Sequence, residues 1–303
     1  MRPARAHSIA AAGIRRAALL AAILTLALSA AGCERAYSGE RGQVRGPLGR
    51  ALDAYLSRLE GFGFSGSAFV AKGGEIVLDR GYGLADRVRR RPYTAETIFD
   101  IASISKQFTA AAILKLETEG KLKTADPIAK FFGPVPPDKE PLTLHRLLTH
   151  TAGLAESFGD EYEPVSRQEL IRRALASDLL VRPGRKFRYS NAGYSLLAAV
   201  VEIAAGEPYE TYLRQRLWQP AGMAHTGFHV PDRGRAAHGY APGLDWGTPF
   251  DHPWAPDGPY WNLRGCGGIV TTADDLYRWH QALAGDAILP RAEREKLITP
   301  WVF

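Results

Sequence analysis

Cysteine is scarce in this chain, with only Cys33 and Cys266 among 303 residues. Two cysteines cannot build a disulfide framework, and neither stands at a Cys/His spacing that would hold a zinc ion. The sequence also lacks a Lys/Arg stripe interleaved with aromatic residues, an internal repeat and a Gly-x-Ser-x-Gly segment. These absences argue against a metal or other cofactor, against nucleic-acid binding, against a repeat architecture and against one common strand-to-helix elbow for a nucleophilic serine.

The first 33 residues have the three-part order of a bacterial secretory signal. Four arginines precede an uncharged apolar run from Ala17 to Ser29, which is too short for a transmembrane helix. Residues 28–33, Leu-Ser-Ala-Ala-Gly-Cys, resemble a lipoprotein cleavage box in which Cys33 is acylated, and cleavage without lipid is the alternative. We therefore expect a periplasmic protein of the cell envelope that a lipid on Cys33 anchors to a membrane.

Most of the net charge belongs to this signal. The whole chain carries +6, but residues 1–33 hold four arginines and no acid, which leaves +2 for the rest. With 46% hydrophobic and 23% charged residues, the composition is that of an ordinary globular protein. Residues 34–47 are polar and aperiodic, which predicts a tether, and residues 48–303 predict one domain.

Periodicity and turn residues predict the elements of this domain. An amphipathic helix that ends at Gly61 precedes a hairpin, whose apolar strands flank Lys-Gly-Gly at residues 72–74. Helical patterns dominate from residue 120 to about 225, and the run from Ala192 to Ala205 is apolar nearly all round, which is typical of a buried central helix.

A long loop is predicted for residues 240–262, which contain five prolines and six aromatic residues. Long ordered loops often wall a binding cleft, and simple surface packing is the alternative here. Residues Thr272 to Leu283 then predict a last helix with an N-cap and acids in its first turn.

The segment around Ser103 carries the strongest chemical signal. An apolar run ends at Ile101 and helical periodicity begins, so Ser103 is expected at a helix N-terminus, where unpaired N–H groups and the macrodipole favour an oxyanion. Lys106, at i+3, lies on the same helical face. It can accept the serine proton if burial and neighbouring charge disfavour its cation by roughly 4 to 5 kcal/mol. A helix cap followed by a solvated lysine is the alternative interpretation.

A second group of polar residues lies in Arg-Tyr-Ser-Asn-Ala-Gly-Tyr at positions 188–194. In an extended segment residues i and i+2 share a face, so Tyr189 and Asn191 can point into one cleft. A tyrosine beside a lysine cation sheds its proton more easily, and an asparagine amide can hold both a lysine and a substrate amide. A core tyrosine followed by a turn asparagine would show the same letters.

Together, Ser103-x-x-Lys106 and Tyr189-x-Asn191 resemble the penicillin-recognising serine hydrolases, in particular the class C β-lactamase and D-alanyl-D-alanine carboxypeptidase branch. Residues 97–110, 147–154, 222–228 and 267–276 also look like segments of this family. The resemblance runs from about residue 48 to 303 and implies an α/β (α+β) fold, in which a helical region interrupts an antiparallel sheet flanked by helices. It implies that Ser103 is acylated with its own N–H as one oxyanion donor. It also implies that Lys106 and Tyr189 share proton transfer, and that Asn191 orients the substrate.

The resemblance breaks at the family's third motif, a Lys-x-Gly or His-x-Gly on a strand that supplies the second oxyanion donor. Residues 72–74 fit the letters but lie in the predicted hairpin turn, and His225-Thr226-Gly227 falls in a different segment of the family pattern. We therefore expect the family's C-terminal strands and final helix to be absent from residues 48–303. Loss of one oxyanion donor costs about 2.7 to 4 kcal/mol of transition-state stabilisation.

These observations predict a monomeric serine hydrolase of the cell envelope, acylated on Ser103 by a β-lactam, a D-amino-acid peptide or an ester. The residues leave open which substrate is used and whether Lys106 or Tyr189 is the base. A non-catalytic envelope binding protein, or an inactive truncated homologue, is the alternative.

Overall fold

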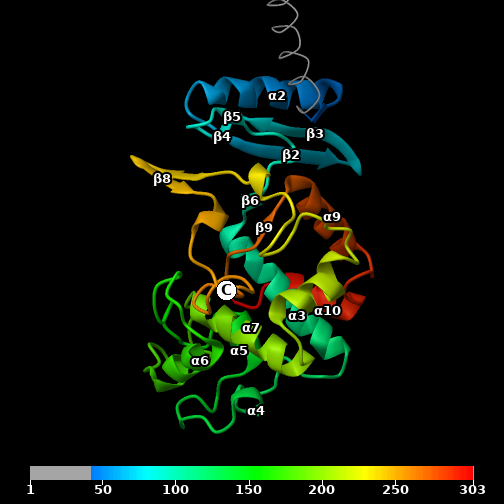
Figure 1. Ribbon diagram of the computed structural model, residues 1–303. Helices are drawn as coiled ribbons and strands as arrows, with labels where there is room; N and C mark the ends of the chain where they lie inside the picture. Colours follow the sequence, from blue (N-terminus) through cyan, green and yellow to red (C-terminus); the bar gives the residue numbers. More distant parts are fainter. Residues whose placement is uncertain (1–41, 303) are drawn as a thin grey trace, which may run out of the picture.

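A three-stranded antiparallel sheet lies at one end of the computed structural model, which describes residues 42–302 (Figure 1). The strands β1 (Gln43–Val44), β2 (Gly66–Lys72) and β3 (Glu75–Tyr82) follow the order β1–β3–β2, and helix α2 (Gly46–Glu60) lies over β3. The predicted hairpin is confirmed, with its turn at Gly73 and Gly74. Their φ angles of +60° and +85° are conformations that glycine adopts without steric cost.

The predicted signal, Cys33 and most of the predicted tether lie outside the described residues. The described end of that tether has regular structure, because Gln43 lies opposite Asp79 in the sheet and the Arg45 N–H donates to the Val77 carbonyl at 2.9 Å. A strand that is held only by backbone hydrogen bonds needs no alternating hydrophobic side chains. The polar sequence of this segment therefore does not predict a strand.

Short strands connect the sheet to the helical region. Strand β6 pairs antiparallel with β9, and Phe99 lies opposite Thr271. The hairpin β7–β8 lies within the predicted long loop, and Gly243, with φ of +73°, lies in its turn. The short elements are β4 (Leu84–Asp86), β5 (Arg91–Pro92), β6 (Phe99–Asp100), β7 (Gly239–Ala241), β8 (Leu244–Gly247), β9 (Val270–Thr271), and the 3₁₀ turns η1 (Ala102–Ser105), η3 (Arg233–Arg235) and η4 (Pro249–Asp251).

Helices α3 (Lys106–Thr118) and α7 (Asn191–Ala205) pack together in the core below the sheet (Figure 1). The prediction of a buried central helix is confirmed, since residues 192–201 of α7 are all buried. The other helices are α4 (Ala129–Phe132), α5 (Leu144–Leu148), α6 (Arg167–Ala176), α8 (Tyr209–Leu213) with its π-helical continuation η2 (Arg214–Trp218), α9 (Ala273–Ala284) and α10 (Arg291–Ile298).

Helix α9 joins the two parts of the molecule. The Tyr277 ring on α9 lies 4.8 Å from the Phe69 ring on β2, and Trp279 lies 4.7 Å from Phe108 on α3. The predicted α/β fold of antiparallel sheet, flanking helices and helical region is therefore confirmed. Among the described helices, none is both long and apolar enough to cross a membrane.

Candidate active site

Ser103 lies where β6 ends and α3 is about to begin. The Ile101 N–H donates to the Ile269 carbonyl at 3.1 Å, which ties this approach to the segment before β9. Ala102 then has φ of +44°, a left-handed conformation that costs an alanine roughly 1 kcal/mol. The Asp100 carboxylate accepts the Ala102 N–H at 2.6 Å and holds this bend. The bend directs the chain into η1, which carries the serine.

Lys106 and Tyr189 both contact the Ser103 hydroxyl. Lys106 Nζ donates to Ser103 Oγ and to the Cys266 carbonyl oxygen, each at 3.0 Å, and the Tyr189 hydroxyl donates to Ser103 Oγ at 2.8 Å. The lysine is only 7% exposed, and its Nζ lies 4.8 Å from the centre of the Tyr189 ring. A hydroxyl nucleophile therefore lies within hydrogen-bond distance of two groups that transfer protons in other enzymes.

His150 packs against Tyr189, with ring centroids 4.6 Å apart and an interplanar angle of 28°. Its Nδ1 accepts the Ser190 N–H at 3.1 Å, so the neutral ring carries its proton on Nε2. Its carbonyl accepts the Arg188 N–H at 2.7 Å. Burial, and after it the charge of Lys106, lowers the pKa of His150 to about 4. The ring is therefore neutral at pH 7 and holds the segment that carries Tyr189.

Asn191, the fourth predicted site residue, is the first residue of α7. The preceding Ser190 caps this helix, since its Oγ accepts the Gly193 N–H at 3.0 Å and donates to the Ala155 carbonyl at 2.7 Å. The Asn191 Oδ1 is buried and has no hydrogen-bond partner within residues 42–302. The structure thus brings Ser103, Lys106 and Tyr189 into mutual contact and leaves the Asn191 oxygen able to accept a further hydrogen bond.

The two sequence matches to a third motif both have structural roles. Residues 72–74 form the β2–β3 turn, as expected. Thr226 is buried, and its Oγ1 lies 2.6 Å from Thr271 Oγ1 and donates to Asp275 Oδ2 at 2.8 Å. Between positions 42 and 302, no group of three or more His, Cys, Asp or Glu side chains is arranged to hold a metal ion.

Cys266 is a buried free thiol, and burial raises its pKa to about 11. Its contribution to the site is the main-chain carbonyl that accepts Lys106. Reasoning from the sequence missed this contact, because a main-chain atom has no residue signature. It also missed His150, whose bonds to the chain around Tyr189 depend on tertiary structure.

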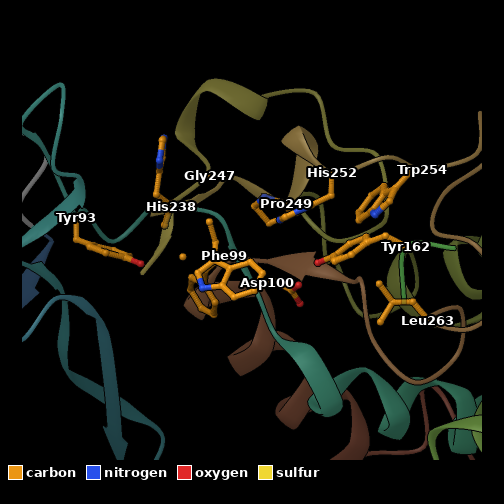
Figure 2. Close-up of a pocket in the computed structure, with 13 residues that line it drawn as sticks. Tyr93, Phe99, Asp100, Tyr162, His238, Gly247, Pro249, His252, Trp254 and Leu263 are labelled. Carbon is orange, nitrogen blue, oxygen red and sulfur yellow. The ribbon is translucent and has the colours of Figure 1, made fainter. Parts of the chain in front are cut away.

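A pocket of about 290 Å³ opens beside this turn, and Asp100 and Leu263 line it (Figure 2). Five of its other lining residues come from the predicted long loop, among them Trp246, His252 and Trp254. Of the two interpretations of residues 240–262, the structure therefore favours the wall of a cleft.

Comparison with known proteins gives one family and several relatives. The family model described as Beta-lactamase matches residues 60–302. A Bacillus subtilis protein named for penicillin binding is 34% identical over 244 residues, which are 80% of this chain and 60% of that relative. Esterase EstB of Burkholderia gladioli is 35% identical over 196 residues, which are 58% of this chain and 50% of the esterase. The chain thus spans between half and three fifths of the length of these two relatives.

A solved structure is also similar. The octameric penicillin-binding protein homologue from Pyrococcus abyssi has a TM-score of 0.69 at 30% identity, over 84% of this chain and 62% of that one. Because this neighbour is an octamer, the monomeric state expected for the present chain stays a prediction.

Proposed function

Because the chain belongs to the Beta-lactamase family of hydrolases, we propose that it is a serine hydrolase acylated on Ser103. The observation that carries this proposal is the double contact of Ser103 Oγ, 3.0 Å from Lys106 Nζ and 2.8 Å from the Tyr189 hydroxyl. The proposed substrates are β-lactams, D-amino-acid peptides and esters. One relative named for penicillin binding and one esterase support this range.

In the proposed acylation, Ser103 Oγ attacks the carbonyl carbon of the substrate and its proton passes to Lys106 or Tyr189. The bond from the carbonyl carbon to the leaving oxygen or nitrogen then breaks, and the leaving group takes a proton. Water repeats the sequence on the acyl-enzyme, so that the acid is released and the serine regains its proton. Ser103 N–H is proposed as one oxyanion donor. Asn191, whose oxygen has no partner among residues 42–302, is proposed as the group that orients the substrate.

The Cys266 carbonyl has a positioning role in this scheme. It accepts a hydrogen bond from Lys106 Nζ at 3.0 Å and so holds this nitrogen 3.0 Å from Ser103 Oγ. Tyr189 and Lys106 both contact the same oxygen, and for that reason the geometry is compatible with either group as the base.

The test is covalent labelling by a fluorescent penicillin and by a fluorophosphonate. We expect both probes to label the protein, an adduct on Ser103 by mass spectrometry, and no labelling of Ser103→Ala. Ser105→Ala is the matched control, because it removes a hydroxyl from the same turn that is buried and unpaired in the described residues. Labelling that survives Ser103→Ala would refute the proposal. Saturable binding without an adduct would support a non-catalytic binding protein instead.

We also propose that the protein is exported to the periplasm and anchored through an acylated Cys33. The order of charged, apolar and small residues before Cys33 supports this location. Metabolic labelling with an alkyne fatty acid tests it, since Cys33→Ala should remove the label and release the protein from the membrane fraction. A wild-type chain that stays unlabelled would contradict the anchor.

A further inference from the structure

The pocket beside the Ser103 turn is walled by aromatic rings from well-separated segments of the chain (Figure 2). The rings belong to Tyr93, Phe99, Tyr162, Trp246 and Trp254. His252 stacks on the Tyr162 ring at 4.4 Å with an interplanar angle of 16°. The negative faces of such rings attract cations, and a wall of several rings is a common way to recognise an ammonium group.

One carboxylate, that of Asp100, lies in this aromatic pocket, and in Figure 2 it points toward the Tyr162 hydroxyl. Its Oδ1 accepts the Ala102 N–H at 2.6 Å, and no lysine or arginine of residues 42–302 forms an ion pair with it. Loss of surrounding solvent raises the pKa of Asp100, and its hydrogen bond with the Ala102 N–H acts against this shift. A carboxylate that no lysine or arginine neutralises gains stability when a ligand cation binds next to it.

Further negative charge lies close to Asp100. Burial, followed by the charges of Asp100 and Asp160, raises the pKa of Glu161, and the charge of Glu161 acts in turn on Tyr162. These carboxylates favour a cationic over an anionic ligand group at the Asp100 end of the pocket.

The pocket lies close to the turn that carries the reacting hydroxyl. Asp100 precedes Ser103 by three residues, so their Cα atoms are at most about 11 Å apart. Leu263 lines the pocket and packs against Gly267, the neighbour of the residue whose carbonyl accepts Lys106. Glu161 also responds to the charges of both Asp100 and Lys106. An acyl chain of several atoms attached to Ser103 can therefore reach into the pocket.

We propose that this pocket selects substrates whose acyl portion carries an ammonium group several atoms from the scissile carbonyl. The inference rests on the proposed acylation of Ser103. Asp100 pairs with the ammonium group, and the faces of Trp246 and Trp254 surround it. An uncharged acyl chain of the same length fills the pocket but leaves the carboxylate without a partner.

Asp100 also has a local role, because its carboxylate accepts the Ala102 N–H in the bend before Ser103. Asparagine keeps an Oδ1 acceptor at this place and removes the charge, whereas alanine removes both. Asp100→Asn therefore separates recognition of a cation from support of the bend. Asp286→Asn is the matched control, since Asp286 is an 80% exposed acid that pairs with Arg294 outside the pocket.

The experiment compares p-nitrophenyl 6-aminohexanoate with p-nitrophenyl heptanoate, which has a methyl group in place of the ammonium. For the wild type and Asp286→Asn we expect a kcat/KM about tenfold higher for the amino ester, which corresponds to about 1.4 kcal/mol. Asp100→Asn should lose this preference, so that its kcat/KM values for the two esters become equal within about twofold. Trp246→Ala, at a 50% exposed position that is tolerant of change, should reduce the preference about threefold.

The outcomes separate the two proposals. If the wild type hydrolyses both esters equally and Ser103→Ala hydrolyses neither, the inference is overturned and the proposed function stands. If neither ester shows turnover that depends on Ser103, the inference is overturned, and labelling of Ser103 by the penicillin and the fluorophosphonate decides the proposed function separately. A preference that survives both Asp100→Asn and Trp246→Ala would also overturn the inference.

Discussion

Replacement of His150 by asparagine isolates the contribution of one ring to the position of Tyr189. In the native chain, Nδ1 of His150 accepts the Ser190 N–H at 3.1 Å and the ring stacks on Tyr189 at 4.6 Å. Asparagine places Oδ1 close to the position of Nδ1 and tolerates the left-handed φ of +56° at this residue. His150→Asn should therefore keep the hydrogen bond and lose the stacked ring, whereas His150→Ala loses both.

The expected magnitudes follow from these two contacts. A stacked ring pair contributes about 0.5 to 1.5 kcal/mol, and a buried hydrogen bond contributes about 1 kcal/mol. Because the Tyr189 hydroxyl must lie close to Ser103 Oγ for proton transfer, we expect kcat to fall about tenfold in His150→Asn and up to about a hundredfold in His150→Ala. KM should change less than about threefold, since His150 does not contact the proposed substrate.

The pH dependence of stability gives a second measurement on the same residue. The pKa of His150 is about 4 in the folded protein, against an ordinary value of 6.5. As the pH falls, the unfolded chain binds the proton first, so the folded state loses stability between pH 6.5 and about pH 4. The full shift corresponds to about 3 kcal/mol, and partial exposure of the ring reduces this to about 1 to 2 kcal/mol.

Hydrolysis of a p-nitrophenyl ester gives kcat and KM, and urea unfolding at pH 7.5 and pH 4.5 gives the free energy of unfolding. His150→Asn should lose less stability than the wild type between the two pH values. Equal losses would refute the argument from the histidine pKa. A kcat that is unchanged in both variants would refute the positioning role.

Three further changes test other parts of the structure. Tyr189→Phe removes the hydroxyl that donates to Ser103, and it should lower kcat about 10²- to 10³-fold with little change in melting temperature. An unchanged kcat would exclude a role of Tyr189 in proton transfer. Ser190→Ala removes the α7 N-cap and should lower the free energy of unfolding in urea by about 1 to 2 kcal/mol, whereas a loss below about 0.3 kcal/mol would contradict the capping role. Burial, aided by Asp274, raises the pKa of Asp79 to about 6, so the contribution of Asp79 to the free energy of unfolding should fall as the pH rises from 3.8 to about 6, opposite in sign to that of His150. Over this range, the free energy of unfolding of Asp79→Asn in urea should increase more with pH than that of the wild type, and an unchanged slope would contradict the assignment.

The sequence predicted correctly those helices and turns whose conformation depends mainly on their own residues. The all-round apolar pattern of α7 requires burial wherever that helix lies, and Lys72-Gly73-Gly74 favours a tight turn in any context. Strand β1 and the β7–β8 hairpin were missed, because strands of two to four residues are too short to show a hydrophobic period and are held by backbone pairing with a partner. Helix α10 was also missed. Its sequence, Arg-Ala-Glu-Arg-Glu-Lys-Leu-Ile, has no hydrophobic stripe, which agrees with the absence of buried residues in this helix.

In the site, too, contacts between residues close in sequence were predictable, and contacts between distant residues were not. Ser103 and Lys106 lie three residues apart on one turn, so the sequence alone places their side chains on one face. Tyr189 reaches the serine from 86 residues away, and only resemblance to a family predicted that they meet. The roles of His150 and of the Cys266 carbonyl arise from tertiary packing that no local pattern encodes.

The contact between Lys106 and the Cys266 carbonyl closes a loop of 160 residues. A contact of such sequence separation forms only after the intervening chain has become ordered, because its entropy of closure must be overcome first. A partly folded chain that contains α3 would already present the serine and the lysine, but without the carbonyl that orients the ammonium. The rate at which a serine-directed probe reacts during refolding should therefore lag behind the recovery of helical circular dichroism, and nucleophilic reactivity would report the last stage of folding.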